Sequence, residues 1–201
     1  MPWIKTIPYA AAQGRLKKLY DRIKGPDDRV DNIMMSHSLR PHSMEGHMAL
    51  YKNVLHHSGN RLPKWLLEAL GTYVSHLNAC DYCFQHHLAG RARLIGDDTR
   101  SAAIKAALVA DRPEDAFDGR ELAAMGYAKA LTTAPAAMAE THVLALRDSG
   151  LDDGEILEIN QVVSYFAYAN RTVLGLGTSI KGEVLGLSPG DSDDPDNWSH
   201  G

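Results

Sequence analysis

Residues 68–87 read Glu68-Ala-Leu-Gly-Thr-Tyr-Val-Ser-His76-Leu-Asn-Ala-Cys80-Asp-Tyr82-Cys83-Phe-Gln-His86-His87, and they contain both cysteines of the chain. On a helix, Cys80, Cys83 and His87 share one face, because they are spaced three and four residues apart. Two thiols at this spacing can close into a disulfide and reopen. A basic group beside them raises the fraction of thiolate, which attacks a peroxide or a disulfide. The pattern predicts thiol redox chemistry.

Glu68 tests whether the helix around the cysteines is continuous. An unbroken helix would hold Glu68 about 18 Å from Cys80 along its axis, at ~1.5 Å per residue. If Glu68 takes part in the chemistry, the helix must therefore break between Leu77 and Cys80, with Asn78 as the expected N-cap of the next helix. The cysteines would then lie in the first turn, where the helix dipole favours a thiolate by about 0.3–1 kcal/mol.

The composition is that of a folded protein with no charged surface for polyanions. Hydrophobic residues make up 44% of the 201 residues and charged residues 23%, which excludes wholesale disorder. The 21 basic and 25 acidic residues give a net charge of -4, so we expect neither nucleic acid nor a membrane as a partner. Without a signal-like N-terminus or an apolar run of about 20 residues, the expected location is the cytoplasm. Two cysteines in that reducing compartment are not expected to be a structural staple.

The residue pattern is helical throughout. Ala, Leu, Glu, Lys and Arg recur at helical spacing and strand-like alternation is almost absent, so the predicted fold class is all-α. Asp118 with Glu121 and Asp152 with Glu155 have the spacing of capping boxes. The helices that we expect cover residues 10–24, 28–38, 41 to near 58, 65–77, a segment from the cysteines to 94 that Gly96 closes, 119–132, 137–149 and 153–174.

A wider pattern joins these residues: a Glu, eleven residues, Cys-x-x-Cys, three residues and a His, filled by Glu68, Cys80, Cys83 and His87. In this pattern the sequence resembles the carboxymuconolactone decarboxylase and alkylhydroperoxidase D superfamily, and within it the peroxidase-related proteins. The resemblance implies an alkylhydroperoxidase D-like helical bundle. It divides the chain into an N-terminal helical extension (1–54), a helical core (55–187) and an acidic, flexible tail (188–201).

The resemblance also implies roles for the matched residues. In the family the second cysteine meets the peroxide, the first resolves it, and the Glu and His relay protons. Carried over, Cys83 is the peroxidatic cysteine, Cys80 is the resolving one, and Glu68 with His87 forms the relay. Tyr82 stands where alkylhydroperoxidase D has a His, which shortens the expected relay.

The predicted function is a thiol-dependent peroxidase that reduces hydroperoxides through a Cys80/Cys83 dithiol–disulfide cycle without a cofactor. The expected partners are a small hydroperoxide, an external dithiol reductant (a lipoyl protein, a thioredoxin-like protein or a low-molecular-weight thiol) and further copies of the chain in a trimer or a hexamer of dimers. The alternative is a non-peroxidase member of the family: a lactone decarboxylase-like enzyme, a general disulfide reductase, or a regulatory or binding protein.

A zinc site is the main chemical rival to the redox pair. His76, Cys80, Cys83 and His87 follow one another at spacings of four, three and four, and Cys and His are good zinc ligands. Four ligands spread over about 16 Å of one helix cannot surround an ion, so we expect no metal. The remaining histidines are expected to be surface or packing residues, with His86 facing away from the sulfurs: His37, His42, His47, His56, His57 and His86.

Overall fold

The computed structural model describes residues 2–190, 192–194 and 196–200 of the chain. Over these residues the protein has nine α-helices and no β-strand, only two isolated bridges that involve the C-terminal segment. The predicted all-α class is therefore confirmed. No helix in the described ranges is both long enough and apolar enough to cross a bilayer.

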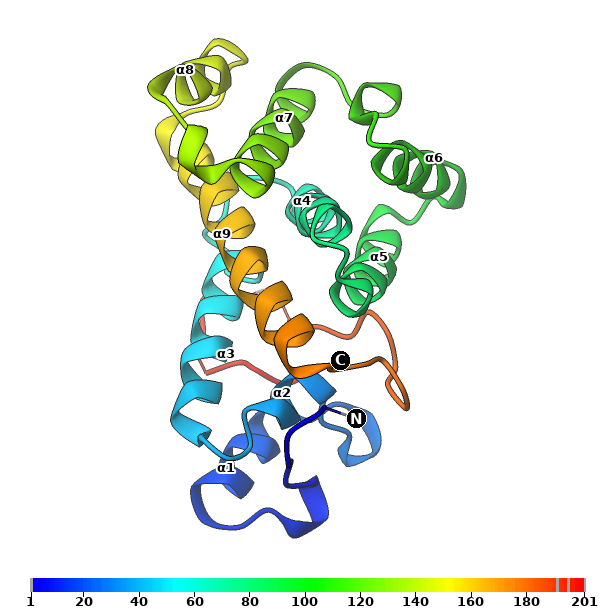
Figure 1. Ribbon diagram of the computed structural model, residues 1–201, viewed down its shortest axis with the longest axis vertical. Coiled ribbons are helices and arrows are strands. Elements are labelled where there is room, and N and C mark those ends of the chain that lie inside the picture. Colours follow the sequence, from blue (N-terminus) through cyan, green and yellow to red (C-terminus); the bar gives the residue numbers. More distant parts are fainter. Residues whose placement is uncertain (1, 191, 195, 201) are drawn as a thin grey trace.

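The first three helices form the lower end of the molecule in Figure 1: α1 (Gly14–Ile23), α2 (Asn32–Ser36) and α3 (Pro41–Leu55). Pro41 occupies the first turn of α3, where its missing N–H costs nothing. The second helix is much shorter than expected, because Asp28 has a left-handed φ and Arg29 and Asp31 have extended ψ angles of 135° and 143°, so the helix begins only at Asn32.

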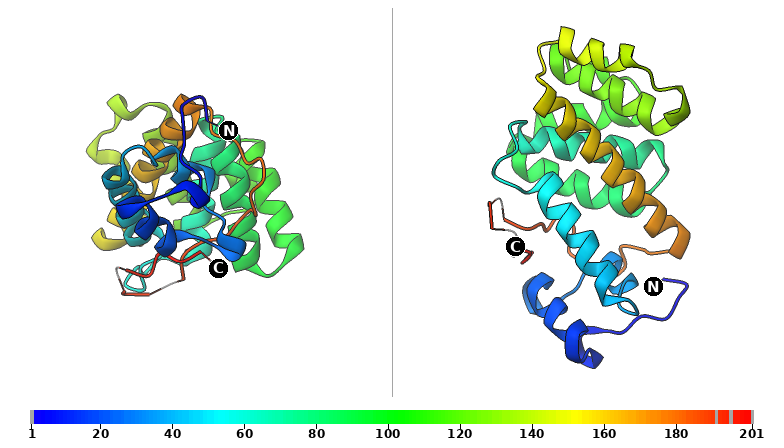
Figure 2. Two further views of the ribbon diagram at one scale, coloured as in Figure 1. Left: turned by 90° about the horizontal axis from the view of Figure 1, so that it is seen from below. Right: turned by 90° about the vertical axis from the view of Figure 1, so that its left-hand side faces the viewer.

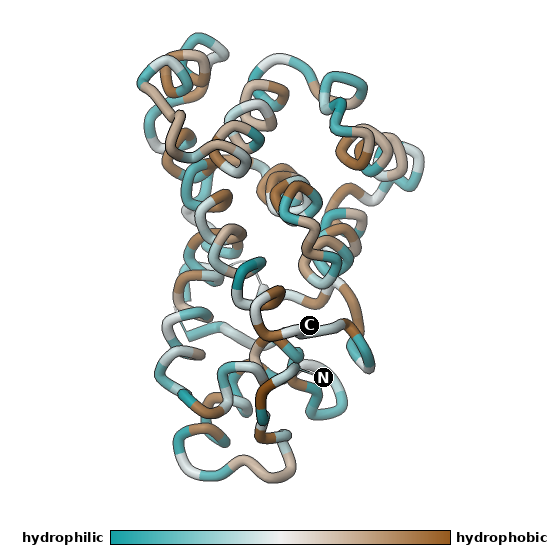
Figure 3. The backbone as a smooth tube through the Cα atoms, in the orientation of Figure 1, coloured by the Kyte–Doolittle hydropathy of each residue, from teal (hydrophilic) through white to brown (hydrophobic). Residues whose placement is uncertain are grey.

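The core is built around α4 (Lys64–Leu77). Every residue from Leu66 to Ser75 is buried, so this helix is covered on all sides. Figures 1 and 3 show it as a largely hydrophobic helix with α5 (Asp81–Ile95), α7 (Gly119–Thr133) and α9 (Asp153–Leu176) around it.

The contact between α4 and α9 needs a glycine. A Cβ added at Gly71 would lie 2.1 Å from a ring carbon of Phe166 on α9, well inside van der Waals contact. The absence of a side chain at Gly71 therefore sets how closely α9, and the Phe166 ring, approach α4.

The two remaining helices complete the upper end: α6 (Asp98–Val109) and α8 (Glu140–Asp148). Helix α6 was not among the expected helices, although Asp97 is an N-cap whose side chain accepts a hydrogen bond from the Arg100 N–H.

Of the two predicted capping boxes, one forms. Asp152 and Glu155 exchange side-chain and backbone hydrogen bonds at the start of α9. The box expected at Asp118 is wrong, because its side chain makes no capping hydrogen bond, although α7 does begin at the next residue.

After α9 the chain returns along the bundle as an irregular C-terminal segment, described over residues 178–190, 192–194 and 196–200 and drawn in orange and red beside α3 in Figure 2. The ammonium group of Lys52, a fully buried residue, donates to the Gly190 carbonyl and the Ser192 hydroxyl of this segment. Nearer the end, the Arg22 guanidinium lies 3.8 Å from the ring centroid of Trp198. These contacts join the C-terminal segment to the N-terminal helices, while the division into extension, core and tail stays a prediction.

Candidate active site

The helix break that the sequence required lies between α4 and α5. Helix α4 ends at Leu77 and α5 begins at Asp81, and Ala79 between them has a left-handed φ of 53° that reverses the chain. The predicted break is confirmed, but its expected cap is wrong. Asn78 still continues α4 as its C-cap, and Cys80 is the N-cap of α5, because the chain can leave the first helix only after the left-handed residue.

The reversal brings Glu68 beside His87. The two helices pack against each other, and Glu68 Oε2 lies 2.7 Å from His87 Nδ1. Both side chains are largely buried, with 3% and 14% of their surface exposed. The carboxylate–imidazole pair that the relay requires is therefore formed across the two helices, nineteen residues apart in the sequence.

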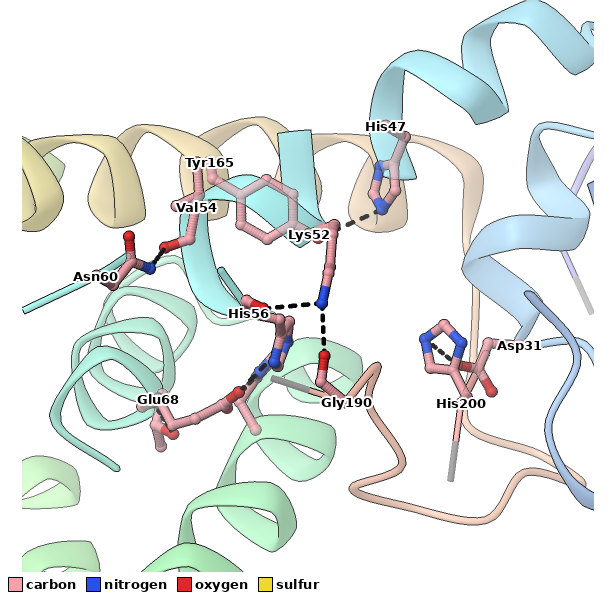
Figure 4. Close-up of polar contacts among 12 residues, drawn as sticks. Asp31, His47, Lys52, Val54, His56, Asn60, Glu68, Tyr165, Gly190 and His200 are labelled. Atoms are coloured by element: carbon pink, nitrogen blue, oxygen red, sulfur yellow. Dashed lines mark hydrogen bonds and ion pairs between the residues drawn. The ribbon is translucent and has the colours of Figure 1, made fainter. Parts of the chain in front are cut away.

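The other oxygen of Glu68 faces a second imidazole. His56 Nε2 lies 3.9 Å from Glu68 Oε1, as Figure 4 shows. Burial, followed by the positive charges of neighbouring groups, lowers the pKa of His56 well below its ordinary value of 6.5. His56 is thus neutral beside Glu68 and does not compete with His87 as a charged partner.

Cys83, Glu68 and His87 line one cavity of about 40 Å³. A water molecule needs about 10–15 Å³ of such volume, so this cavity holds only a few molecules of that size. The lining comes from α2 to α5, from α9 and from the C-terminal segment, and its polar and sulfur-bearing members are Asp31, Met34, His47, Tyr51, Glu68, Tyr82, Cys83, His86, His87, Tyr165, Ser188 and His200.

The C-terminal segment closes this cavity against α5. A Cβ added at Gly186, which has a left-handed φ of 77°, would lie 2.8 Å from the Gly90 nitrogen. Backbone therefore packs directly on backbone at this point. The next residues, Leu187 and Ser188, form part of the cavity wall.

Cys80 faces a different space. It lies at the bottom of an open groove of about 280 Å³ on the outer side of the helix pair, whose lining consists of Ser75, His76, Ala79, Cys80, Asp81, Phe84 and Val109. His76 belongs to this outer groove and His87 to the inner cavity, so the four residues of the possible zinc set do not surround one point. Among the described residues, no group of three or more His, Cys, Asp or Glu side chains is arranged to hold a metal ion.

The two thiols are free, buried and hydrogen-bonded to each other. Hydrogen bonds from the Cys83 thiol and the Cys83 backbone N–H lower the pKa of Cys80, against the opposing effect of burial. The same pairing with Cys80, together with burial, raises the pKa of Cys83 well above its ordinary value. Within the pair, Cys80 therefore loses its proton more readily than Cys83.

Several residues on the cavity were missed by the sequence analysis. The expectation that His86 faces away is wrong: it lines the cavity with Cys83 and His87, because positions 83, 86, 87 and 90 form one stripe of α5. That spacing was visible in the sequence. Glu183, which contacts His86, lies on the irregular C-terminal segment, where no periodic pattern could have indicated it.

The upper wall of the cavity is neutral and aromatic. His47 Nε2 lies 3.3 Å from the Tyr165 hydroxyl, as Figure 4 shows, and the rings of Tyr165 and Tyr51 stack with centroids 5.5 Å apart. Burial, with smaller contributions from His37 and His200, lowers the pKa of His47 to about 3. His47 is therefore uncharged at neutral pH, and this wall supplies shape and polarity rather than charge.

Comparison with known proteins rests on structure alone, since no protein-family model and no curated protein sequence matches this chain significantly. A peroxidase-related protein with an alkylhydroperoxidase AhpD core from Ralstonia eutropha superimposes with a TM-score of 0.73 at 19% identity, covering 92% of this chain and 97% of that one. A peroxidase-related protein from a Silicibacter species gives 0.66 at 24% identity, covering 73% and 74%. The debrominase Bmp8, in a complex with 2,3,4-tribromopyrrole, gives 0.68 at 17% identity, covering 90% and 95%.

These three structures share the bundle of this chain over most of their lengths, and two of them are described as peroxidase-related. The debrominase shows that one fold serves more than one reaction. The resemblance that the Glu68 to His87 pattern indicated is thus supported at the level of the whole fold: this chain has the alkylhydroperoxidase D-like fold of the peroxidase-related proteins.

Proposed function

We propose that this protein is an enzyme, a thiol-dependent peroxidase that reduces small hydroperoxides through a Cys80/Cys83 dithiol–disulfide cycle. The observation that carries the proposal is the cavity that Cys83 shares with the hydrogen-bonded Glu68–His87 pair, whose Oε2 and Nδ1 atoms are 2.7 Å apart. A nucleophile, a proton acceptor and a space beside them for the substrate are the parts that the reaction needs.

Cys83 is the attacking sulfur, because it is the one that opens into the cavity. Its thiol first loses a proton. The thiolate then forms an S–O bond to the terminal peroxide oxygen while the O–O bond breaks, which leaves a sulfenic acid on Cys83 and an alkoxide or hydroxide. Cys80 next forms an S–S bond to Cys83, and the sulfenic oxygen leaves as water with a proton from the protein. Two thiols and one hydroperoxide become one disulfide, one alcohol and one water.

The pKa order of the thiols fits this sequence when the shared proton is counted. Cys80 has the lowered pKa and Cys83 the raised one, so of the two thiols Cys80 gives up its proton more readily and Cys83 retains the shared proton. Moving that proton to Cys80, or to the Glu68–His87 pair, makes Cys83 the nucleophile. Since the acceptors are already in place, activation needs no large rearrangement.

The outer groove supports the proposal that the cysteine pair is oxidised on one side of the helix pair and reduced on the other. The disulfide that closes the cycle has Cys80 at the base of an open groove of about 280 Å³. We propose that an external dithiol attacks Cys80 from this groove: a lipoyl protein, a thioredoxin-like protein or a low-molecular-weight thiol. Such reductants are kept reduced in the cytoplasm, which is the proposed location.

The size of the inner cavity limits the oxidant. About 40 Å³ accommodates hydrogen peroxide, whereas a bulky organic hydroperoxide would require the C-terminal segment at Gly186 to Ser188 to move. We therefore propose small hydroperoxides as substrates. A competing reading, general disulfide reduction, would place the substrate in the outer groove instead, and the experiment below includes a disulfide as a second oxidant.

The experiment measures thiol loss and the modified cysteine together. The reduced protein is treated with one equivalent of hydrogen peroxide or of a small disulfide, and thiols are counted while mass spectrometry maps the product. Cys80→Ser should accumulate a trappable sulfenic acid at Cys83, and Cys83→Ser should react slowly; the double variant measures background. An adduct at Cys80 in Cys83→Ser would exchange the two roles. If every variant reacts with peroxide no faster than a free thiol does, the proposed peroxidase function is wrong.

We also propose a homo-oligomer, a trimer or a hexamer of dimers. Several large apolar residues of α9 are exposed, among them Leu157 at 58%, Tyr168 at 41% and Leu174 at 44%, which favours burial against another copy. Sedimentation at micromolar concentration should give a species larger than the 22.0 kDa chain. A clean monomer would contradict this proposal without affecting the chemistry.

A further inference from the structure

A second carboxylate–imidazole pair faces the cavity beside Cys83. His86 Nε2 lies 3.1 Å from Glu183 Oε2, and the two side chains are 10% and 5% exposed. His86 lines the same cavity as Cys83, three residues earlier on α5. His86 and His87 thus each place an imidazole about one helical turn from the attacking sulfur. Each imidazole is paired with its own buried carboxylate.

Glu183 is held as a carboxylate by three donors. It accepts hydrogen bonds from the Tyr82 hydroxyl at 2.8 Å, from the Asn32 backbone N–H and from His86. A carboxylate only accepts, so an ionised Glu183 satisfies all three groups at once. Its negative charge compensates a positive charge on His86. With Nε2 engaged by Glu183, Nδ1 is the nitrogen left to act on the contents of the cavity that His86 lines.

Tyr82 lines the same cavity, but its hydroxyl is not available as a proton donor to the cavity's contents. Its hydroxyl donates to Glu183 and accepts from the Ile33 N–H, so both of its hydrogen-bonding capacities toward the protein are used. Burial, followed by the negative charge of Glu183, raises the pKa of Tyr82 well above its ordinary value. Tyr82 therefore orients Glu183 and keeps its proton.

Peroxide reduction creates a strong base in a cavity that has room for only a few water molecules. When the O–O bond breaks, the leaving oxygen becomes an alkoxide or hydroxide, and a proton donor beside it lowers the barrier. The Glu68–His87 pair already serves as the acceptor for the Cys83 proton in the proposed function. Two carboxylate–imidazole pairs around one nucleophile allow one to take a proton while the other gives one.

We propose that His86, held by Glu183, is the general acid that protonates the oxygen leaving from the peroxide. This inference rests on the proposed peroxidase function and adds a second proton-transfer residue to it. In the step, the Cys83 thiolate bonds to the terminal oxygen, the O–O bond breaks, and the proton of His86 passes to the departing oxygen to give alcohol or water. His86 becomes neutral and is reprotonated before the next cycle.

The test compares oxidants whose leaving groups differ in basicity. Hydrogen peroxide releases hydroxide and needs a proton, whereas peracetic acid releases acetate and does not. His86→Gln should lower the rate constant for Cys83 oxidation by hydrogen peroxide by about 100-fold, the lower end of the range for a general acid, and that for peracetic acid by less than about 3-fold. Each rate is divided by the wild-type rate with the same oxidant, so access to the cavity cancels.

Two further variants keep the test independent of folding and of the neighbouring acid. Glu183→Gln removes the compensating charge but keeps the shape, and it should show the same selectivity to a smaller extent. Asp31→Asn changes another carboxyl group of the cavity, one that lies 3.9 Å from His200, and should show no selectivity. The exposed His42→Gln is the matched substitution far from the cavity.

The outcomes separate the inference from the function on which it rests. Equal losses with both oxidants in His86→Gln and Glu183→Gln, with unchanged circular dichroism, would give His86 a packing role only and overturn the inference. Selective loss in Asp31→Asn instead would move the donor to Asp31, which also overturns it. If the wild-type protein fails to react with either oxidant, the peroxidase function itself is wrong.

Discussion

The inner and outer sides of the cysteine pair are built differently. On the inner side, Cys83 opens into a cavity of about 40 Å³ beside two carboxylate–imidazole pairs; on the outer side, Cys80 lines an open groove of about 280 Å³. A spacing of three residues within a continuous helix would leave both sulfurs on one face. Here Cys80 is the N-cap of α5, with non-helical backbone angles, and Cys83 lies inside the first turn, so the two residues border different spaces. One disulfide can thus be formed from one side and reduced from the other.

The largest expected effect tests the inner side. Glu68→Gln removes the carboxylate bonded to His87 and should lower the rate of Cys83 oxidation by about 100-fold, because an amide cannot take up a proton. The fold should survive, since Gln has the same shape. Stopped-flow measurement of thiol loss, beside a thermal melt, checks both points. An unchanged rate and pH profile would make Glu68 a structural residue.

A second prediction compares the two thiols directly as a function of pH. A lowered pKa means more thiolate at a given pH, so alkylation of Cys80 should have its midpoint below 9.0 and that of Cys83 above 9.0. Cys80 should therefore be modified before Cys83 near pH 8, because a larger fraction of it is thiolate. Site-resolved mass spectrometry after pulses of iodoacetamide measures the order. Equal midpoints would remove the distinction between the two sides in the resting state.

A third prediction concerns the packing of α9 against α4 beside the inner cavity. Gly71→Ala adds a Cβ within 2.1 Å of Phe166, whose ring lies edge-on to His87 with centroids 4.5 Å apart. It should cost about 1–3 kcal/mol of stability and slow peroxide reduction. Gly126→Ala is the control: it lies within α7 with open space around it and should stabilise by about 0.5–1 kcal/mol. Urea denaturation of both variants measures the difference, and a neutral Gly71→Ala would show that α9 shifts freely.

The smallest expected effect comes from loosening the C-terminal segment that forms part of the cavity wall. Lys52→Met removes the buried ammonium that holds Gly190 and Ser192, so the C-terminal segment should detach locally while the helical core persists. Global stability should fall by less than about 1 kcal/mol, because the freed carbonyls can bind water. Limited proteolysis should cut the segment earlier than in the wild type, and larger hydroperoxides should react relatively faster. Unchanged proteolysis would mean that the other contacts of the segment suffice.

Much of the helical framework could be predicted because the start and end of a helix depend on residues that are close together in the sequence. The capping box at Asp152 and Glu155 starts α9 as expected, and Gly96 closes α5 in a left-handed conformation. Where prediction failed, local signals were weak or misleading. Asp118 has the right spacing for a cap without using it, and the left-handed φ of Asp28 and the extended backbone after it shorten the second helix in a way that residue types alone do not reveal.

In the candidate site, too, one feature could be predicted from the sequence and another could not. The spacing of Glu68, Cys80, Cys83 and His87 was enough to require a helix break, since a straight helix would hold Glu68 about 18 Å away. The expectation for His86 failed because positions 83, 86, 87 and 90 share one stripe of α5, and this stripe faces the cavity. The cavity side of a helix is fixed by its neighbours rather than by its own sequence.

By itself, the sequence determined the all-α class, the closeness of the two cysteines and the helix break that Glu68 requires, because all three follow from spacing within a few turns of chain. Only the tertiary structure decided that Cys83 faces inward and Cys80 outward, and that Glu183 from the far end of the chain meets His86 and Tyr82. The physical reason is the range of the interactions. Helical periodicity is written in neighbouring residues, whereas the C-terminal segment has no period and is placed by long-range contacts such as those of Lys52 and Glu183.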